Sequence, residues 1–149
     1  IDCRTYALHE NKRRRRVTLD DKGEIFAIGD DTGTIAVYDQ HINVLFEESR
    51  AGERGASRAF RGIAINPQAT LLASVSIDNI LRVWDLQKGK REMQWSNYNG
   101  TSISFDARGE RLLAITTDGQ PSLIDGLMTP IEYFIKLQKS AKLTKSKIL

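Results

Sequence analysis

The sequence is poor in the residues that catalytic and metal sites most often use. Its 149 residues include one cysteine, Cys3, and two histidines, His9 and His41, none of them at the spacing of a zinc site. One cysteine forms no disulfide within the chain, which favours a reducing compartment, nuclear or cytoplasmic. The chain contains no phosphate-binding glycine loop, no Gly-x-Ser-x-Gly turn and no cysteine–histidine pair. We therefore expect no enzyme activity, no catalytic residue, no metal and no cofactor.

Long apolar runs are also missing. No stretch approaches the roughly 18–20 residues of a membrane span, and the first four residues lack the apolar segment of a signal peptide. We therefore expect no membrane partner. The first residue is Ile1 rather than methionine, which is consistent with a fragment of a longer protein.

Positive charge is concentrated at the two ends of the chain. The formal net charge is +3, but residues 1–16 and residues 127–149 each carry +4, which leaves −5 for the segment between them. The basic character therefore belongs to the ends, and the middle of the chain is mildly acidic.

Three blocks of similar pattern occupy residues 17–39, 63–85 and 103–125. Each has a short apolar segment, a polar turn, a second apolar segment, a tight turn and a third apolar segment. The turns are rich in aspartate, asparagine and glycine, the residues that tight turns require. The last residues of the blocks, Asp39, Asp85 and Asp125, are 46 and then 40 positions apart. A period near 40–45 residues made of short strands is typical of propeller blades.

The ends of the blocks carry a family resemblance. The second block ends Val83-Trp84-Asp85, and the others end Val37-Tyr38-Asp39 and Leu123-Ile124-Asp125. With these endings the chain resembles the WD-repeat β-propeller family. The resemblance implies an all-β fold built of blades of four antiparallel strands. It also implies equivalent core positions for Tyr38, Trp84 and Ile124.

A turn aspartate supports the same resemblance. Asp78 and Asp118 stand seven residues before the end of their blocks, and Thr32, with Asp31 beside it, takes that place in the first block. The tripeptide Asp31-Thr32-Gly33 also occurs in aspartic proteases, but its place in a predicted hairpin turn favours a structural role. The Gly-His pair of the family is absent, so we do not expect the His–Asp–Trp hydrogen-bond network of a standard blade.

The repeat predicts a division of the chain. Its parts are an outer strand of a preceding blade (1–8), a basic loop (9–16), blade one (17–49), a second basic loop (50–62), blade two (63–97), blade three (98–137) and a basic tail (138–149). Fourth strands are expected at residues 42–47, 91–95 and 131–137. Closed propellers have about four to eight blades. Three blades therefore need more, either from the same chain in a longer form, from another polypeptide, or from a second copy.

Two arginine-rich segments are candidates for binding a partner or a nucleic acid. They comprise Arg13, Arg14, Arg15 and Arg16, and then Arg50, Arg54, Arg58 and Arg61. The resemblance places both on one rim of the propeller. The first run is open to four interpretations: a solvated loop, a contact with nucleic acid, an import signal for the nucleus, or a site for an acidic protein.

The expected function is that of a non-catalytic scaffold. Such a protein would hold other protein subunits together in a nuclear or ribonucleoprotein assembly, because repeat surfaces present loops on a rigid frame. Two alternatives remain. One is direct binding of RNA or DNA through a basic rim, and the other is an adaptor that recruits substrates to a modifying enzyme.

Overall fold

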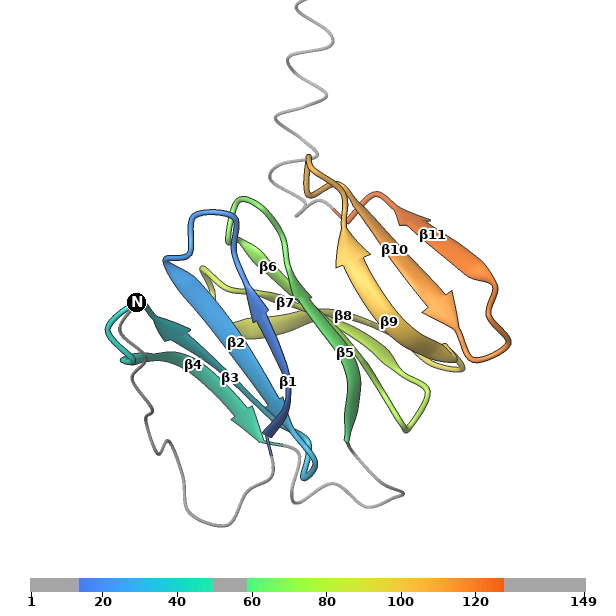
Figure 1. The fold of residues 1–149 in the computed structure, drawn as a ribbon, viewed down its shortest axis with the longest axis horizontal. Helices are drawn as coiled ribbons and strands as arrows, with labels where there is room; N and C mark the ends of the chain where they lie inside the picture. Colours follow the sequence, from blue (N-terminus) through green and yellow to red (C-terminus); the bar gives the residue numbers. More distant parts are fainter. Residues whose placement is uncertain (1–13, 50–58, 128–149) are drawn as a thin grey trace, which may run out of the picture.

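The structure is a computed structural model, and it describes residues 14–49 and 59–127. These residues form antiparallel sheets and no helix (Figure 1). Blade one consists of β1 (Arg14–Leu19), β2 (Ile25–Asp30), β3 (Thr34–Asp39) and β4 (Val44–Ser49). Blade two consists of β5 (Phe60–Ile65), β6 (Leu71–Ser76), β7 (Leu81–Asp85) and β8 (Lys90–Trp95). Blade three consists of β9 (Gly100–Phe105), β10 (Arg111–Thr116) and β11 (Pro121–Asp125). In each sheet, strands that are consecutive in the chain are neighbours.

The predicted fold class is confirmed. Blades one and two are four-stranded antiparallel sheets, as the repeat pattern predicted. In blade three the described residues contribute three strands. Within the described ranges, no helix is long and apolar enough to cross a membrane.

The first turn of every blade is held by the same contact. A side-chain oxygen just after the first strand accepts the backbone N–H at or beside the start of the second strand. The acceptors are Asp20 (to Ile25, 2.9 Å), Asn66 (to Leu71, 2.8 Å) and Asp106 (to Arg111, 3.1 Å). Asparagine and aspartate form such turns readily because their short side chains reach nearby backbone amides.

Blade two lies between the other two blades and is buried on both faces. Its inner strand β5 contacts both β1 and β9, and every residue of β6 and β7 is buried. One apolar cluster joins blades one and two through Ile35, Val37, Phe60 and Trp84. A second cluster joins blades two and three through Val75, Leu81, Ile103 and Leu112. The apolar and small residues of β6 suit burial on two faces, whereas β7 also buries Arg82 and Asp85.

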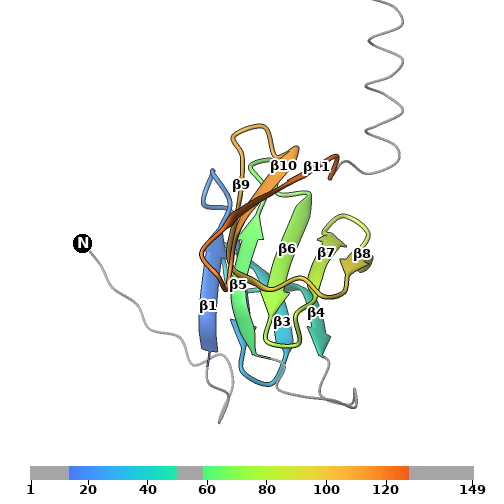
Figure 2. The ribbon, with the colours of Figure 1, turned by 90° about the vertical axis from the view of Figure 1, so that its right-hand side faces the viewer.

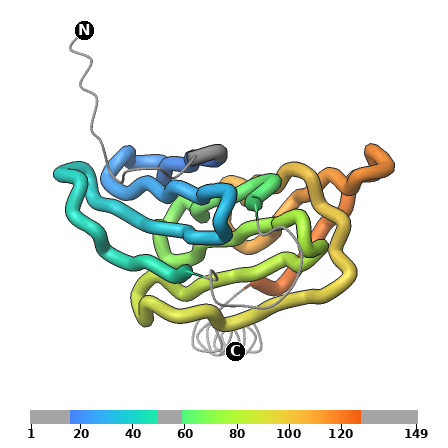
Figure 3. The backbone as a smooth tube through the Cα atoms, turned by 90° about the horizontal axis from the view of Figure 1, so that it is seen from below, coloured from blue at the N-terminus to red at the C-terminus, as the bar shows by residue number. Residues whose placement is uncertain are grey.

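The two end blades each keep one open face. In β10 and β11, exposed residues alternate with residues that are more buried. Leu113 and Leu123 of blade three are exposed, as are Val17 and Leu19 of blade one. Figure 3 shows the described chain as an open row of blades, running from blade one (blue and cyan) to blade three (orange). The described part is therefore a partial propeller.

The blade boundaries differ in detail from those expected. Arg14 and Arg16 belong to β1 rather than to a loop, because their backbones pair with Asp30 and Gly29. Phe60 and Gly62 likewise belong to β5 and pair with β6. Backbone pairing needs no apolar side chain, so the polar composition of these segments did not reveal the strands. The fourth strand of blade one begins at Val44, because Ile42 has a φ of 68° and lies in a turn.

The fourth strand of blade two includes Lys90, one residue before the expected start. Three expectations fall outside the described residues: the outer strand at 1–8, the fourth strand of blade three at 131–137, and the basic tail at 138–149.

Candidate partner-binding rim

Two arginines from neighbouring blades meet on one rim. The Nε of Arg16 in β1 donates a hydrogen bond to the backbone carbonyl of Arg61 in β5. In turn, Nη1 of Arg61 donates to Oδ1 of Asn79, which lies in the turn between β6 and β7, at 3.3 Å. The entrances to the inner strands and this hairpin turn therefore share a rim.

The structure describes only some of the other predicted arginines. The backbones of Arg14 and Arg15 lie in β1. Arg13, Arg50, Arg54 and Arg58 lie outside the described residues. Of the eight predicted arginines, the structure thus brings together the side chain of Arg16 and the backbone of Arg61.

The same rim also carries aspartates from the hairpin turns. Asp78 forms an ion pair with Arg82, with 3.0 Å between Oδ2 and Nη2. Asp118 accepts a hydrogen bond from the hydroxyl of Thr116, and this bond lowers the pKa of the Asp118 carboxyl. Asp118 therefore stays ionised, and the rim presents positive and negative groups side by side.

In each blade a serine or threonine hydroxyl donates a hydrogen bond to a turn aspartate two positions away, but in blade one the aspartate comes first in the chain. In blade two the Ser76 hydroxyl donates to Asp78 at 2.8 Å, and Thr116 donates to Asp118 in the same way in blade three. In blade one the order is reversed: the Thr32 hydroxyl donates to Asp30 at 2.8 Å, two residues earlier in the chain. Asp30 also accepts the backbone N–H of Thr34 at 2.8 Å. Asp30, and not Asp31, is therefore the turn carboxylate of blade one, and Asp31-Thr32-Gly33 belongs to a hairpin turn.

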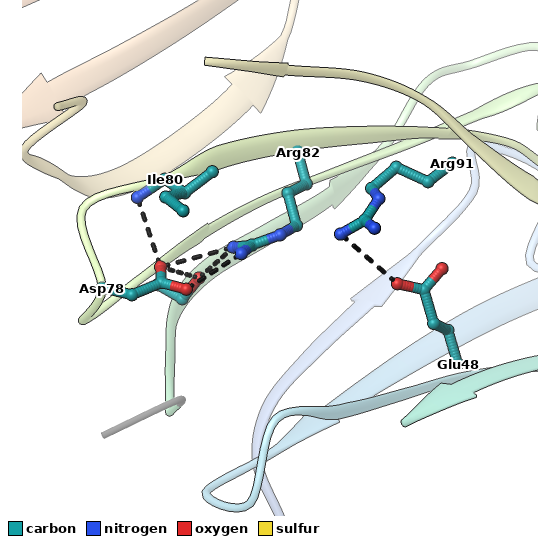
Figure 4. Close-up of polar contacts among 6 residues, drawn as sticks. Glu48, Asp78, Ile80, Arg82 and Arg91 are labelled. Carbon is teal, nitrogen blue, oxygen red and sulfur yellow. Dashed lines mark hydrogen bonds and ion pairs between the residues drawn. The ribbon is translucent and has the colours of Figure 1, made fainter. Parts of the chain in front are cut away.

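Arg82 occupies a position that the sequence did not single out. It is only 3% exposed, and its Nη1 also donates to the Ser76 hydroxyl at 3.1 Å. Figure 4 shows the guanidinium group facing the Asp78 carboxylate, which also accepts the backbone N–H of Ile80 at 3.2 Å. A buried charge requires such pairing. The sequence signal for this ion pair was Arg82 itself, a charged residue among apolar ones in a predicted strand, four positions after Asp78.

Trp84 makes a polar contact between blades. Its side chain is 1% exposed, and its indole Nε1 donates to Oε2 of Glu48 in blade one at 2.7 Å. Arg91 of β8 faces the other oxygen of Glu48 at 3.8 Å (Figure 4). At the equivalent position of blade one, Tyr38 is buried and stacks on Phe26 with ring centroids 5.2 Å apart. In blade three, Ile124 packs against the second apolar cluster.

Two of the three aspartates that end the third strands, Asp39 and Asp85, cap the following turns. Asp39 accepts the backbone N–H groups of His41 (2.8 Å) and Asn43 (2.9 Å), and the hydrogen bonds from Asn43 lower its pKa. Asp85 accepts the N–H of Gln87 at 2.9 Å and lies 3.1 Å from Nζ of Lys88. Asp125 lies 3.9 Å from Nε of Arg111. These residues stabilise the blade edges and form no site of their own.

Two shallow pockets lie on blade three or beside it. One, of about 450 Å³, lies on the rim and is lined by Asn97, Tyr98, Asn99, Thr116, Thr117, Asp118 and Gln120. The other, of about 210 Å³, lies on the open face of the blade and is lined by Ser104, Phe105, Asp106, Arg111, Leu113 and Leu123. In the described part of the chain, no group of three or more histidine, cysteine or acidic side chains is placed to hold a metal ion.

The stacked antiparallel blades and their turn aspartates define a class of protein. The chain belongs to the WD-repeat β-propeller family. It is 30% identical over 127 residues to eukaryotic translation initiation factor 3 subunit I of Phaeosphaeria nodorum, a match that covers 81% of this chain and 36% of that protein. It is also 34% identical over 86 residues to the Schizosaccharomyces pombe protein of the same name. This match covers 54% of this chain and 26% of the Schizosaccharomyces pombe protein.

Other similarities point to the same fold. The chain is 31% identical over 84 residues to periodic tryptophan protein 2 of Arabidopsis thaliana, covering 55% of this chain and 9% of that protein. The β-propeller domain of Cps50 (Swd1) from Myceliophthora thermophila superposes with a TM-score of 0.63 at 21% identity, covering 81% of this chain and 39% of that chain. None of the known protein-family models matches the chain. The chain spans about a third of the length of the Phaeosphaeria nodorum protein.

Proposed function

We propose that the protein is a non-catalytic scaffold that holds protein subunits in a larger assembly. The observation that carries this proposal is the rim on which Arg16, Arg61 and the hairpin turns of adjacent blades converge. Loops on a rigid frame are a common way to bind partners. The similarity to a protein named as a subunit of a translation initiation factor supports the same class of function.

The finer proposal is an assembly that contains RNA, in the nucleus or the cytoplasm. Its support is the run of basic residues at the start of β1 and the second arginine-rich segment, whose last member, Arg61, lies in β5. Arginine is favoured both at protein interfaces and on phosphates. Direct binding of RNA or DNA is therefore the second candidate, and the convergence of Arg16 and Arg61 favours it. In either case the open blades need further blades to complete the propeller.

Alanine substitution of the basic run tests the proposal. The variant replaces Arg13, Arg14, Arg15 and Arg16 together. The matched control is Arg108→Ala, because Arg108 is exposed in the turn between β9 and β10, at the opposite ends of the strands. We expect the first variant to keep its circular dichroism spectrum and to lose a protein subunit in a pull-down that the control retains.

An RNA-binding measurement on the same proteins separates the two candidates. If the arginines contact phosphates, the log of the affinity for single-stranded RNA falls by about 0.7 per contact for each log unit of salt, and the variant flattens that slope. The scaffold proposal predicts an unchanged slope. If neither the subunit nor RNA binding changes, both candidates fail for this rim.

A further inference from the structure

The turn carboxylate of blade two has a cation of its own. Asp78 accepts the Ser76 hydroxyl at 2.8 Å and faces the guanidinium of Arg82 with both of its oxygens. Nη1 of Arg82 lies 3.3 Å from Oδ1 of Asp78, and Nη2 lies 3.0 Å from Oδ2. Arg82 is the second residue of β7 and is buried. Such two-point pairing is the strong form of the contact between an arginine and a carboxylate.

The turn carboxylate of blade three lacks this partner. Asp118 accepts the hydroxyl of Thr116, as in blade two, but the second residue of β11 is Ser122 in place of an arginine. In the described part of the chain Asp118 forms no ion pair. It is exposed, and hydrogen bonds from the Thr116 hydroxyl and the Gln120 backbone lower its pKa. The hairpin turn therefore presents an ionised carboxylate at the place where blade two has a closed pair.

Asp118 lines a pocket of about 450 Å³ that two segments of the chain form together. One segment joins β8 to β9 and the other is the turn between β10 and β11, and Figure 2 shows them side by side. The backbone N–H of Thr117 donates to the carbonyl of Asn99 at 2.8 Å, and that of Tyr98 donates to the carbonyl of Asn79 at 2.7 Å. These main-chain bonds hold the walls in place, so a ligand need not order them.

The other polar side chains of the pocket are available to a ligand. Asn97, Asn99 and Gln120 each bring an amide group, and Thr117 brings a hydroxyl. None of these four side chains makes a hydrogen bond or an ion pair within the described residues. Tyr98 is the aromatic residue of the lining. The pocket thus combines a carboxylate, several hydrogen-bond acceptors and one aromatic wall.

From these features we propose that the pocket beside Asp118 binds an arginine side chain presented by a partner protein. The guanidinium pairs with Asp118 from another chain, as Arg82 pairs with Asp78 within blade two. Its remaining N–H groups donate to the amide oxygens of the lining, and its aliphatic stem lies against Tyr98. Lysine fits less well, because it lacks the planar fork that matches two carboxylate oxygens. Nucleic acid does not fit, because like charges placed together oppose binding.

The pocket matters because an exposed ion pair by itself contributes little, since water and salt screen it. Hydrogen bonds from the lining to the same guanidinium add specificity to the charge. A protein partner is part of the proposed scaffold function, on which this site therefore rests. The site itself is distinct from the contact of Arg16 with Arg61.

Titration of the 149-residue chain with short peptides tests the site. The probe is the tripeptide Gly-Arg-Gly with both ends blocked, and the nitrogen–proton correlation spectrum of the protein reports binding. We expect the amide signals of Asn99, Asp118 and Gly119 to shift. The same peptide with citrulline has nearly the same shape without the charge, and it should bind at least about tenfold more weakly. A lysine peptide should also bind more weakly than the arginine peptide.

Two variants assign the binding to the carboxylate. Asp118→Asn removes the charge and should lower the affinity about tenfold. The matched control is Asp125→Asn, at an exposed aspartate at the far end of β11, and it should bind as the wild type does. Ser122→Arg supplies from the chain itself the arginine that blade two has, so it should abolish peptide binding. The spectrum of each variant shows whether it is folded.

Three results would overturn the proposal. They are equal affinity for the citrulline or lysine peptide, unchanged affinity in Asp118→Asn, and full affinity in Ser122→Arg. The peptides probe the pocket alone. A failure here therefore leaves the pull-down with the variant of Arg13, Arg14, Arg15 and Arg16, and with it the proposed function, unaffected.

Discussion

Trp84 of blade two donates its indole N–H to Glu48 of blade one at 2.7 Å. The hydrogen bond therefore links two blades, whereas the His–Asp–Trp network of a standard blade, which we did not expect in this chain, would lie inside one blade. In blade two Arg82 partners the turn aspartate Asp78. Polar groups in this chain thus stabilise both the blade itself and the position of one blade on the next.

Replacing Trp84 should reveal this link. Trp84→Ala should lower the free energy of unfolding by about 3–5 kcal/mol, the usual cost of truncating a buried aromatic side chain. Trp84→Phe keeps much of the ring and should cost about 1.5–3 kcal/mol, because the hydrogen bond to the charged Glu48 is lost. The measurement is urea denaturation followed by far-UV circular dichroism.

A double-mutant cycle of Trp84→Phe with Glu48→Ala should give a coupling energy of at least about 0.5 kcal/mol. The control Trp95→Phe, at a residue that is 38% exposed on β8, should stay within about 0.5 kcal/mol of the wild type. Strictly additive effects of Trp84→Phe and Glu48→Ala would contradict the contact.

Two glycines lie in close contact with the neighbouring blade, and they predict a rescue by size exchange. A Cβ atom on Gly29 would lie 2.7 Å from Cδ2 of Phe60, and one on Gly100 would lie 2.8 Å from Cγ1 of Val75. Gly100→Phe alone should cost about 1–3 kcal/mol, since a new side chain must enter a packed interface against Val75. Val75→Gly alone leaves a cavity and is also destabilising. Val75→Gly removes one of the two side chains that a ring at position 100 would meet, the other being Tyr98, so the double variant should be more stable than the sum of the single effects by about 1 kcal/mol. Additive costs in urea denaturation would show that Val75 does not limit the space beside position 100.

The inverted turn of blade one predicts a second rescue. Asp30→Ser alone removes the acceptor for the Thr32 hydroxyl and the Thr34 N–H, which should cost about 1–3 kcal/mol. Adding Thr32→Asp recreates the order of Ser76 and Asp78 and should recover most of that loss. Thermal denaturation measures both the loss of stability and its recovery. A double variant that melts below Asp30→Ser would disprove the equivalence of the turns.

The sequence predicted the blades well and their edges poorly. Periodic apolar segments and turn residues were enough for the strands that end at Asp39, Asp85 and Asp125. They could not show that Arg14 and Arg16 belong to a strand, because backbone pairing leaves no mark on side-chain polarity.

The contacts between blades were also beyond the sequence. Arg82 and Asp78 are close in the chain, so their pairing could have been proposed. Glu48 is 36 positions from Trp84, and its role depends on how two sheets pack. The contact of Gly29 with Phe60 is equally remote. The candidate rim was predictable as a cluster of arginines beside the hairpin turns that contain Asp78 and Asp118. The hydrogen bond from Arg16 to the carbonyl of Arg61, which joins neighbouring blades, was not.

Acid should weaken the fold through the turn aspartates. Hydrogen bonds lower the pKa of Asp39, Asp106 and Asp118, chiefly from the side chain of Asn43, the backbone of Arg111 and the hydroxyl of Thr116. A lowered pKa in the folded state stabilises the protein above the unfolded pKa of about 3.9, and that contribution is lost as the pH falls through the folded value.

The free energy of unfolding should therefore stay level between pH 8 and about 5 and fall below about 4. Asp106→Asn should make the fall less steep, because asparagine caps the same turn at Asn66 without titrating. Identical acid transitions for the variant and the wild type, followed by circular dichroism, would rule out a contribution from Asp106.

Hydrogen exchange of the 149-residue chain tests most directly whether it is an open row of propeller blades. Blade two is covered on both faces, whereas the end blades each keep one open face. Amide protection should therefore be greatest in β6 and β7 and should fall toward β10 and β11. Equal protection across all three blades would contradict the account, since it would mean that the end faces are not open.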